Sequence, residues 1–216
     1  MNPLPVLVIG QSPRPDLEAE IAAAAPGLRI ALRGALDGLS RAAVAALRPR
    51  DGADTLFTLL PSGEGVAVSK AAVGARLASM LPEGPALLAC TGAFPGLPAR
   101  PGLVFPSGVL NALAGALLPC GRLGLCVPLP EQAEALGAAR ARAGIEVAAV
   151  PLRPGADDAA RDEAGARLAM LAPDLVLLDC ISYTRADKAR LARHVGCPVL
   201  LSVAVAARAA ACLMPE

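Results

Sequence analysis

Two stretches of the sequence share one pattern: PALLACTGAF at residues 85–94 and DLVLLDCISY at residues 174–183. Each is a short run of Leu, Val and Ala that leads to a cysteine, Cys90 in the first and Cys180 in the second. Unbroken apolar runs of this length are typical of strands in a parallel sheet covered on both faces. The pattern therefore predicts two buried strands, each with a cysteine at its carboxyl end.

The segments upstream of these strands also resemble each other. Residues 6–34 and residues 124–154 both consist of an apolar run, a Pro-rich turn, an Ala-rich stretch and a second apolar run. We interpret this as a weak internal repeat that forms two similar α/β lobes facing each other. The Pro/Gly-rich stretch at 92–102 is the predicted linker. The expected domains are 1–101, completed by a C-terminal helix at 202–216, and 102–201.

The rest of the chain alternates between apolar runs and Ala-rich amphipathic stretches, which predicts βαβ units with right-handed crossovers. The expected strands are 4–9, 28–32, 55–60, 86–89, 123–127, 146–150, 175–178 and 199–201. The expected helices are 14–25, 40–48, 69–81, 107–118, 130–143, 157–171, 185–195 and 202–213. The fold class is α/β.

Composition excludes several functions. The 216 residues are 55% hydrophobic, which excludes disorder. A net charge of +1 and an aromatic content of 2% argue against nucleic-acid binding. The chain starts without a basic targeting region, and the apolar stretch at 198–214 is too short to span a bilayer. We expect a cytoplasmic protein with no nucleic-acid or membrane partner.

Metal and pyridoxal chemistry are not predicted. The sequence has six cysteines without a CxxC pair and one histidine, His194, so zinc-ligand spacing is absent. The two lysines, Lys70 and Lys188, have no Schiff-base context. The remaining cysteines are expected to be buried small hydrophobes remote from any site: Cys120, Cys126, Cys197 and Cys212.

Several motifs carry a family resemblance: IGQSPRPD (9–16), GALDGLS (34–40), DTLFTLLPSGEGVAVSK (54–70), LLACTG (87–92) and VLLDCISY (176–183). Together they resemble the AroM family, which is similar to the aspartate/glutamate racemase superfamily. The resemblance implies two Rossmann-like lobes with parallel sheets, related by a pseudo-twofold axis with a cleft between them. It also implies chemistry at the carbon α to a substrate carboxylate, with no cofactor and no metal.

The resemblance implies that Cys90 and Cys180 are catalytic and that Thr91 helps to bind the carboxylate. The second motif departs from the racemases, which carry Thr and His where this chain has Ile181 and Ser182. Asp179 precedes Cys180, and its charge disfavours a thiolate if it faces the site. The alternative is that both cysteines are ordinary small residues at strand ends.

Loops at the carboxyl ends of strands supply the other candidates, because ligands of open parallel sheets bind there. Residues 10–16 can form an anion nest, with Arg14 as a carboxylate ligand; the alternative is a plain turn with Arg14 in solvent. A second loop at 61–65 suits closure over a ligand or a tight turn. Tyr183 and Thr184 begin a helix, where capping is the alternative. The predicted substrate-binding residues are Gly10, Gln11, Ser12, Arg14, Ser62, Gly63, Glu64, Thr91, Gly92, Ser182 and Tyr183.

The leading hypothesis is a cofactor-independent racemase or epimerase acting on a small carboxylate through two cysteines. A decarboxylase, a cis–trans isomerase and a non-catalytic carboxylate-binding protein stay open, as does a homodimeric assembly. Acid and base must reach one carbon from opposite faces, so we expect Cys90 and Cys180 to face each other with sulfurs roughly 7–8 Å apart in a closed form. His194 is expected to interact with its own helix C-terminus rather than to catalyse.

Overall fold

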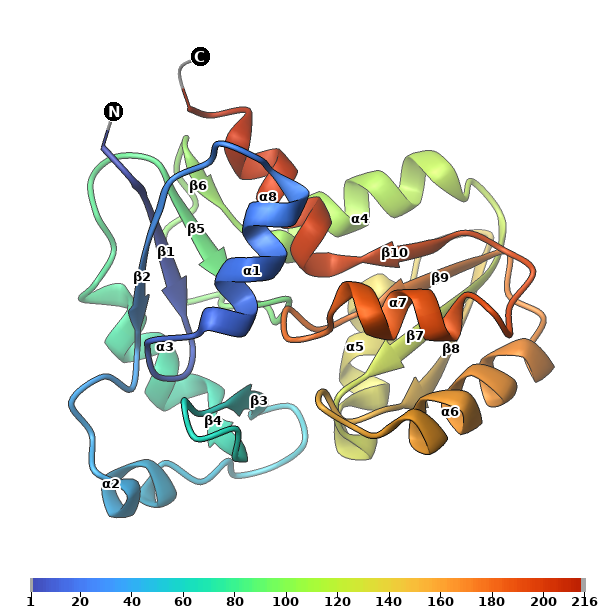
Figure 1. Ribbon diagram of the computed structural model, residues 1–216, viewed down its shortest axis with the longest axis horizontal. Coiled ribbons are helices and arrows are strands. Elements are labelled where there is room, and N and C mark those ends of the chain that lie inside the picture. Colours follow the sequence, from blue (N-terminus) through green and yellow to red (C-terminus); the bar gives the residue numbers. More distant parts are fainter. Residues whose placement is uncertain (1, 215–216) are drawn as a thin grey trace. The chain divides into compact units, whose positions relative to one another are not determined.

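The computed structural model describes residues 2–214 and has an α/β fold, as predicted (Figure 1). It divides into two compact units. The first comprises the chain up to Val109 and the segment from Ala204 onward, and the second is Leu110–Val203. The boundaries between the two units fall inside two helices, α4 (Pro106–Leu117) and α8 (Ser202–Ala211). The sequence prediction placed these boundaries after residues 101 and 201.

The first unit is built on a parallel sheet with the strand order β2-β1-β5-β6. Its strands are β1 (Leu4–Val8), β2 (Ile30–Gly34), β5 (Ala86–Ala89) and β6 (Leu103–Val104). Val8 pairs with Ala89, so β1 and β5 end at the same edge of the sheet. The loops that follow these two strands therefore leave the sheet side by side.

The second unit repeats this arrangement. Its strands are β7 (Gly121–Val127), β8 (Ile145–Pro151), β9 (Leu175–Leu178) and β10 (Val199–Leu201), in the order β8-β7-β9-β10 when read from the other end. In this order β7 corresponds to β1, β8 to β2, β9 to β5 and β10 to β6. All pairings in the sheet are parallel. The weak sequence repeat is thus present as a repeated sheet topology.

The first unit also carries an antiparallel hairpin of β3 (Thr55–Leu59) and β4 (Gly65–Ser69), separate from the parallel sheet. The strand predicted at 55–60 is present as β3, but its expected place in a parallel sheet was wrong, and β4 and β6 were missed. Gly63, with φ +82°, turns the chain between the two strands. An apolar run predicts that a strand is buried, but not which strand it pairs with. β6 has only two residues, too few to give a recognisable pattern.

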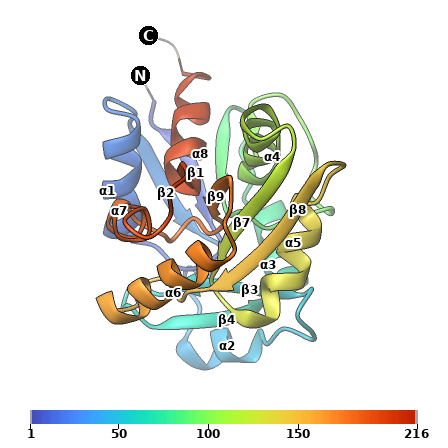
Figure 2. The same ribbon diagram turned by 90° about the vertical axis from the view of Figure 1, so that its right-hand side faces the viewer.

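The remaining elements are helices close to their predicted positions. They are α1 (Pro15–Ala24), α2 (Arg41–Ala46), α3 (Lys70–Ala78), the short 3-10 helix η1 (Pro130–Gln132), α5 (Ala133–Arg140), α6 (Asp158–Met170) and α7 (Arg185–Leu191). In the second unit α5 lies on one side of the sheet and the packed pair α6 and α7 on the other (Figure 2).

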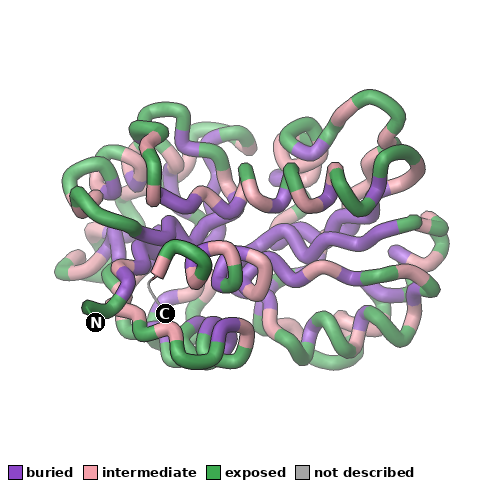
Figure 3. The backbone as a smooth tube through the Cα atoms, turned by 90° about the horizontal axis from the view of Figure 1, so that it is seen from above, coloured by how far each residue is buried: buried purple, intermediate pink, exposed green. Residues whose placement is uncertain are grey.

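Burial is concentrated in the strands, and the helices expose their outer faces (Figure 3). In the first unit one apolar cluster joins Leu7 of β1, Leu88 of β5, Val73 of α3 and the Cys90 side chain. Within residues 2–214, none of the helices combines the length and the apolar character needed to cross a membrane.

Candidate functional site

Cys90 lies directly after β5, at the sheet edge where the loop beginning at Gly10 leaves β1. Its side chain is only 7% exposed. The backbone N–H of Gly92 donates to the Cys90 Sγ over an N···S distance of 3.4 Å. The first unit therefore holds a nearly buried sulfur that accepts an N–H from the turn following its own strand.

Cys180 has the same environment in the second unit. It follows β9 after Asp179 and is 6% exposed. The backbone N–H of Ser182 donates to the Cys180 Sγ, with an N···S distance of 3.5 Å. In both units the donor is the residue two positions after the cysteine. An N–H directed at sulfur stabilises a thiolate more than a thiol.

A buried ion pair fixes the residue before Cys180. The Arg140 Nε and Nη2 each donate to one carboxylate oxygen of Asp179, both at 2.8 Å, and Arg140 Nη1 donates to Asn111 Oδ1 at 2.9 Å. Both members of the pair are almost completely buried. The negative charge of Asp179 is therefore compensated by Arg140. Nothing in the sequence marked Arg140, because its partner comes from a strand end far along the chain.

Tyr183 is fully buried. Its hydroxyl donates to the carbonyl of Leu152 and accepts a hydrogen bond from the Cys126 thiol at 3.5 Å. Burial raises the pKa of Cys126 to about 12 and the pKa of Tyr183 well above its ordinary value. Both groups are therefore protonated at neutral pH, and the role of Tyr183 in substrate binding stays a prediction.

The next residue, Thr184, is the N-cap of α7, the structural role weighed as an alternative from the sequence. Its Oγ1 accepts the N–H of Asp187 at 3.2 Å, and the Asp187 carboxylate accepts the N–H of Thr184 at 2.7 Å. This reciprocal capping box sets the start of the helix that follows Cys180.

The predicted anion nest after β1 contains a carboxylate of the chain itself. Asp37 accepts hydrogen bonds from the backbone N–H of Ser12 at 2.6 Å, from the Ser12 hydroxyl at 2.6 Å and from the N–H of Gly34 at 2.8 Å. Gly34 permits this approach, because a Cβ there would lie 2.5 Å from the Asp37 Oδ1. The Ser12 donors are thus used internally, and their contact with substrate stays a prediction.

Arg14 is buried, so the alternative that it lies in solvent is wrong. Its Nε and Nη2 donate to the two carboxylate oxygens of Asp16 at 2.8 and 2.6 Å, and its Nη1 donates to the Leu59 carbonyl at 3.3 Å. The guanidinium therefore ties the first loop to β3. Its role as a substrate ligand stays a prediction.

The structure brings three of the predicted residues to one cavity of about 320 Å³ in the first unit: Gln11, Ser62 and Glu64. Gln11 Nε2 donates to the carbonyls of Leu36 and Leu39, at 3.2 and 3.0 Å. Glu64 forms an exposed ion pair with Arg41, at 3.0 Å. The first loop and the turn of the β3–β4 hairpin thus contribute to the same concave surface.

The remaining cysteines were predicted to be buried, and this was wrong for most of them. Cys126 is buried, Cys197 is half-buried, and Cys120 and Cys212 are exposed. Cys120 lies in the turn before β7 and Cys212 follows the end of α8, positions that an apolar composition does not distinguish from a core.

His194 lies beyond α7, where its backbone N–H donates to the Leu191 carbonyl at the end of that helix, at 3.0 Å. Its ring contacts Asp162 of α6, with an Nε2···Oδ1 distance of 2.9 Å. Among residues 2–214, the structure contains no group of three or more His, Cys, Asp and Glu side chains able to hold a metal ion.

Comparison with known proteins decides the family. The sequence profile of the AroM protein family matches residues 4–214. The chain belongs to the AroM family. The match spans both units and confirms the resemblance inferred from the motifs. No curated protein matches the sequence.

Solved structures with the same fold include glutamate racemase isoform RacE1 from Bacillus anthracis, with a TM-score of 0.64 and 12% identity over 96% of this chain and 79% of that one. Arylmalonate decarboxylase has a TM-score of 0.55 and 18% identity over 97% and 92% of the two chains. The maleate isomerase Iso from Pseudomonas putida S16 has a TM-score of 0.58 and 13% identity over 96% and 91%. These likenesses establish the racemase-like fold of this AroM protein.

Proposed function

We propose that this AroM protein is a cofactor-independent racemase or epimerase that moves a proton at the carbon α to a small carboxylate. Cys90 and Cys180 are the acid and base of this proposal. Fold likeness to glutamate racemase, maleate isomerase and arylmalonate decarboxylase supports an enzyme that acts on carboxylates.

The observation that carries the proposal is the duplicated environment of the two sulfurs. Each follows an equivalent strand, each is nearly buried, and each accepts the N–H of the residue two positions later. A purely apolar cysteine needs no such donor. Its repetition in both units supports a function shared by both cysteines.

The proposed reaction needs no external reagent. One thiolate removes the α-proton and becomes a thiol, and the electron pair of the broken C–H bond delocalises into the substrate carboxylate. The opposite thiol then gives its proton to the other face of the carbon and becomes a thiolate. The two cysteines exchange roles for the reverse reaction, so the enzyme handles both enantiomers.

The Arg140–Asp179 pair removes one objection to this mechanism. A free carboxylate beside Cys180 would oppose formation of a thiolate. Because Asp179 is bound in a bidentate geometry by a buried guanidinium, its charge is balanced on the side of Arg140. Both cysteines are then free of an uncompensated negative neighbour on their own strand end.

The experiment is a chiral assay across a panel of amino acids and dicarboxylic acids with the wild type, Cys90→Ser and Cys180→Ser. We expect inversion of at least one acid by the wild type and a loss of at least about 100-fold in each variant, since each removes an acid–base group. Cys212→Ser, an exposed cysteine, is the matched control and should retain full activity. Inversion at the wild-type rate by either test variant would refute the proposal.

Decarboxylation of a substituted malonate is the second candidate. It is supported by the likeness to arylmalonate decarboxylase along nearly the full length of both chains. It requires one protonating thiol rather than two. Release of CO₂ from a malonate by the wild type and by only one of the two serine variants would favour it over racemisation. Thermal stabilisation by a carboxylate with no product from any acid would instead favour a binding protein.

A further inference from the structure

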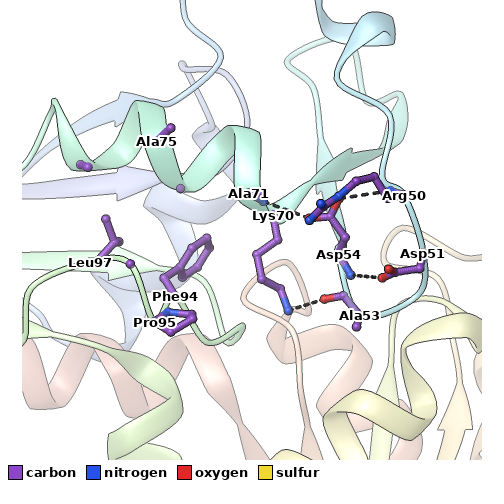
Figure 4. Close-up of a pocket in the computed structure, with 13 residues that line it drawn as sticks. Arg50, Asp51, Ala53, Asp54, Lys70, Ala71, Ala75, Phe94, Pro95 and Leu97 are labelled. Carbon is purple, nitrogen blue, oxygen red and sulfur yellow. Dashed lines mark hydrogen bonds and ion pairs between the residues drawn. The ribbon is translucent and has the colours of Figure 1, made fainter.

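The first unit carries a second and larger cavity, of about 510 Å³ (Figure 4). Three segments form it: the chain before β3, one face of α3, and the turn that follows Cys90 and Thr91. The lining residues are Arg50, Asp51, Ala53, Asp54, Lys70, Ala71, Gly74, Ala75, Ala78, Phe94, Pro95, Gly96 and Leu97. None of them belongs to the predicted catalytic or substrate-binding residues.

One side of the cavity is apolar. Helix α3 presents only small side chains there, those of Ala71, Ala75 and Ala78, which leave room above the helix. The Phe94 ring forms the opposite wall close to the helix, since a Cβ on Gly74 would lie 3.6 Å from the Phe94 Cδ1. The ring therefore packs against the helix at Gly74, and the apolar slot of the cavity runs beside the ring, along the alanine face of α3. Such a slot suits a flat or branched apolar group.

The other side of the cavity is polar, and its acidic groups are already engaged. The Asp54 carboxylate accepts the N–H of Ala71 at 3.0 Å, the N–H of Arg50 at 3.1 Å and the Arg50 Nε at 3.3 Å. Asp51 accepts the N–H of Asp54 at 2.8 Å. The Asp54 carboxylate thus holds the chain before β3 against α3, and its charge is balanced by Arg50.

Lys70 is the charged group between these carboxylates and the Phe94 ring (Figure 4). Its Nζ donates to the Ala53 carbonyl at 2.6 Å, a neutral acceptor. Lys70 forms no ion pair with any residue from 2 to 214, and the ammonium has further N–H donors to offer. An ammonium without a carboxylate partner beside an apolar slot favours a ligand that is anionic at one end and apolar at the other.

We propose that this cavity binds a small monocarboxylate with an aromatic or branched aliphatic body. Its carboxylate pairs with Lys70, and its apolar body lies along the alanine face of α3, beside the Phe94 ring. The volume lies in the range of small-molecule pockets, about 300–1,000 Å³. The site does not depend on the cysteine chemistry proposed above.

The test is calorimetric titration of the full chain with 3-phenylpropanoate, and with the neutral 3-phenylpropanamide and the cationic 3-phenylpropylamine. We expect saturable binding of the carboxylate and at least about tenfold weaker binding of the other two compounds, the effect of losing one charge-assisted hydrogen bond. Lys70→Met should weaken binding of the carboxylate by a similar factor. Ala75→Leu, at an exposed helix position, should also weaken it by filling the slot.

Lys188→Met is the matched control, because Lys188 is the other lysine of the chain and lies exposed on α7. It should bind 3-phenylpropanoate like the wild type. Because the chain has two lysines, acetylation followed by mass spectrometry measures the accessibility of each one. The carboxylate should slow acetylation of Lys70 and leave the acetylation rate of Lys188 unchanged. Equal affinity in Lys70→Met, equal affinity for the amide, or unprotected Lys70 at saturating ligand would each overturn the proposal.

Discussion

Cys90 and Cys180 follow equivalent strands, but the chain continues differently after each of them. After Cys90 it runs through a Pro/Gly-rich segment to β6, without a helix. After Cys180 it enters α7 through the Thr184 capping box, with the buried Arg140–Asp179 pair directly behind. The second unit thus has buried polar bonds next to its cysteine, whereas in the first unit the turn that follows the cysteine lines the larger cavity.

The two units share some structural features and differ in others. The strand order and the N–H donor to sulfur are common to both units. Between β2 and β5 the first unit carries α2, the β3–β4 hairpin and α3, whereas the second unit has only α6 between β8 and β9; this longer segment supplies residues to both cavities. We infer that buried polar bonds hold Cys180 in place in the second unit, while the first unit provides the adaptable surfaces.

The largest expected difference between the two units is in the free energy of unfolding when one arginine is removed from each. Arg140→Met leaves Asp179 charged and buried, and should lower the free energy of unfolding by about 3–5 kcal/mol. Arg14→Met is the counterpart in the first unit, where Asp16 is 43% exposed and can be solvated; we expect a loss of about 1–2 kcal/mol. Urea denaturation of both variants measures the difference. Equal losses would show that the second unit is not held by its ion pair.

A smaller effect concerns Asp54, which joins the inserted hairpin to α3. Burial raises the pKa of Asp54, but the N–H groups of Ala71 and Arg50 outweigh it and lower the pKa to about 2. Its stabilising contribution is therefore complete above pH of about 4 and lost as the pH falls toward 2. Asp54→Asn should cost about 2 kcal/mol at pH 7 and flatten the stability curve in this acid range.

Urea midpoints measured from pH 2 to pH 7 test this prediction. Asp51→Asn is the control, because Asp51 lies exposed in the same segment. An Asp54→Asn protein with the wild-type acid dependence would contradict the account of how the hairpin is attached.

The smallest effect concerns Tyr183, whose side chain is buried in the core. Tyr183→Phe removes the donor to the Leu152 carbonyl and should lower the free energy of unfolding by about 1 kcal/mol. Turnover of any acid found in the panel should change less than about threefold, because Tyr183 is fully buried and its ring is retained in the variant. A large loss of activity at unchanged stability would instead support the sequence prediction that Tyr183 binds substrate.

The sequence predicted the parallel strands well, because each is an unbroken apolar run. The strands at 86–89, 175–178 and 199–201 have the predicted bounds, and the cysteines follow the first two as expected. The family resemblance rests on the same motifs, and the profile match to residues 4–214 confirms it.

The features that the sequence did not predict depend on contacts between distant residues. The pairing of β3 with β4 is set by a turn, and no apolar run specifies it. The Arg140–Asp179 pair joins a helix end to a strand end, and Asp37 reaches back to Ser12. Cys120 and Cys212 are exposed because of where their elements end. In each case the residue type was visible in the sequence and its partner was not.

The central claim is that Cys90 and Cys180 act as two bases on opposite faces of one carbon. The most direct measurement is isotope incorporation in D₂O, with one enantiomer of an acid that the wild type inverts, analysed at low conversion. A two-base mechanism predicts deuterium at the α-carbon of the product enantiomer and almost none in the recovered substrate, because the donating thiol has exchanged with solvent and the removed proton has not returned. Equal deuterium in product and recovered substrate would mean that a single base serves both faces, and would contradict the account.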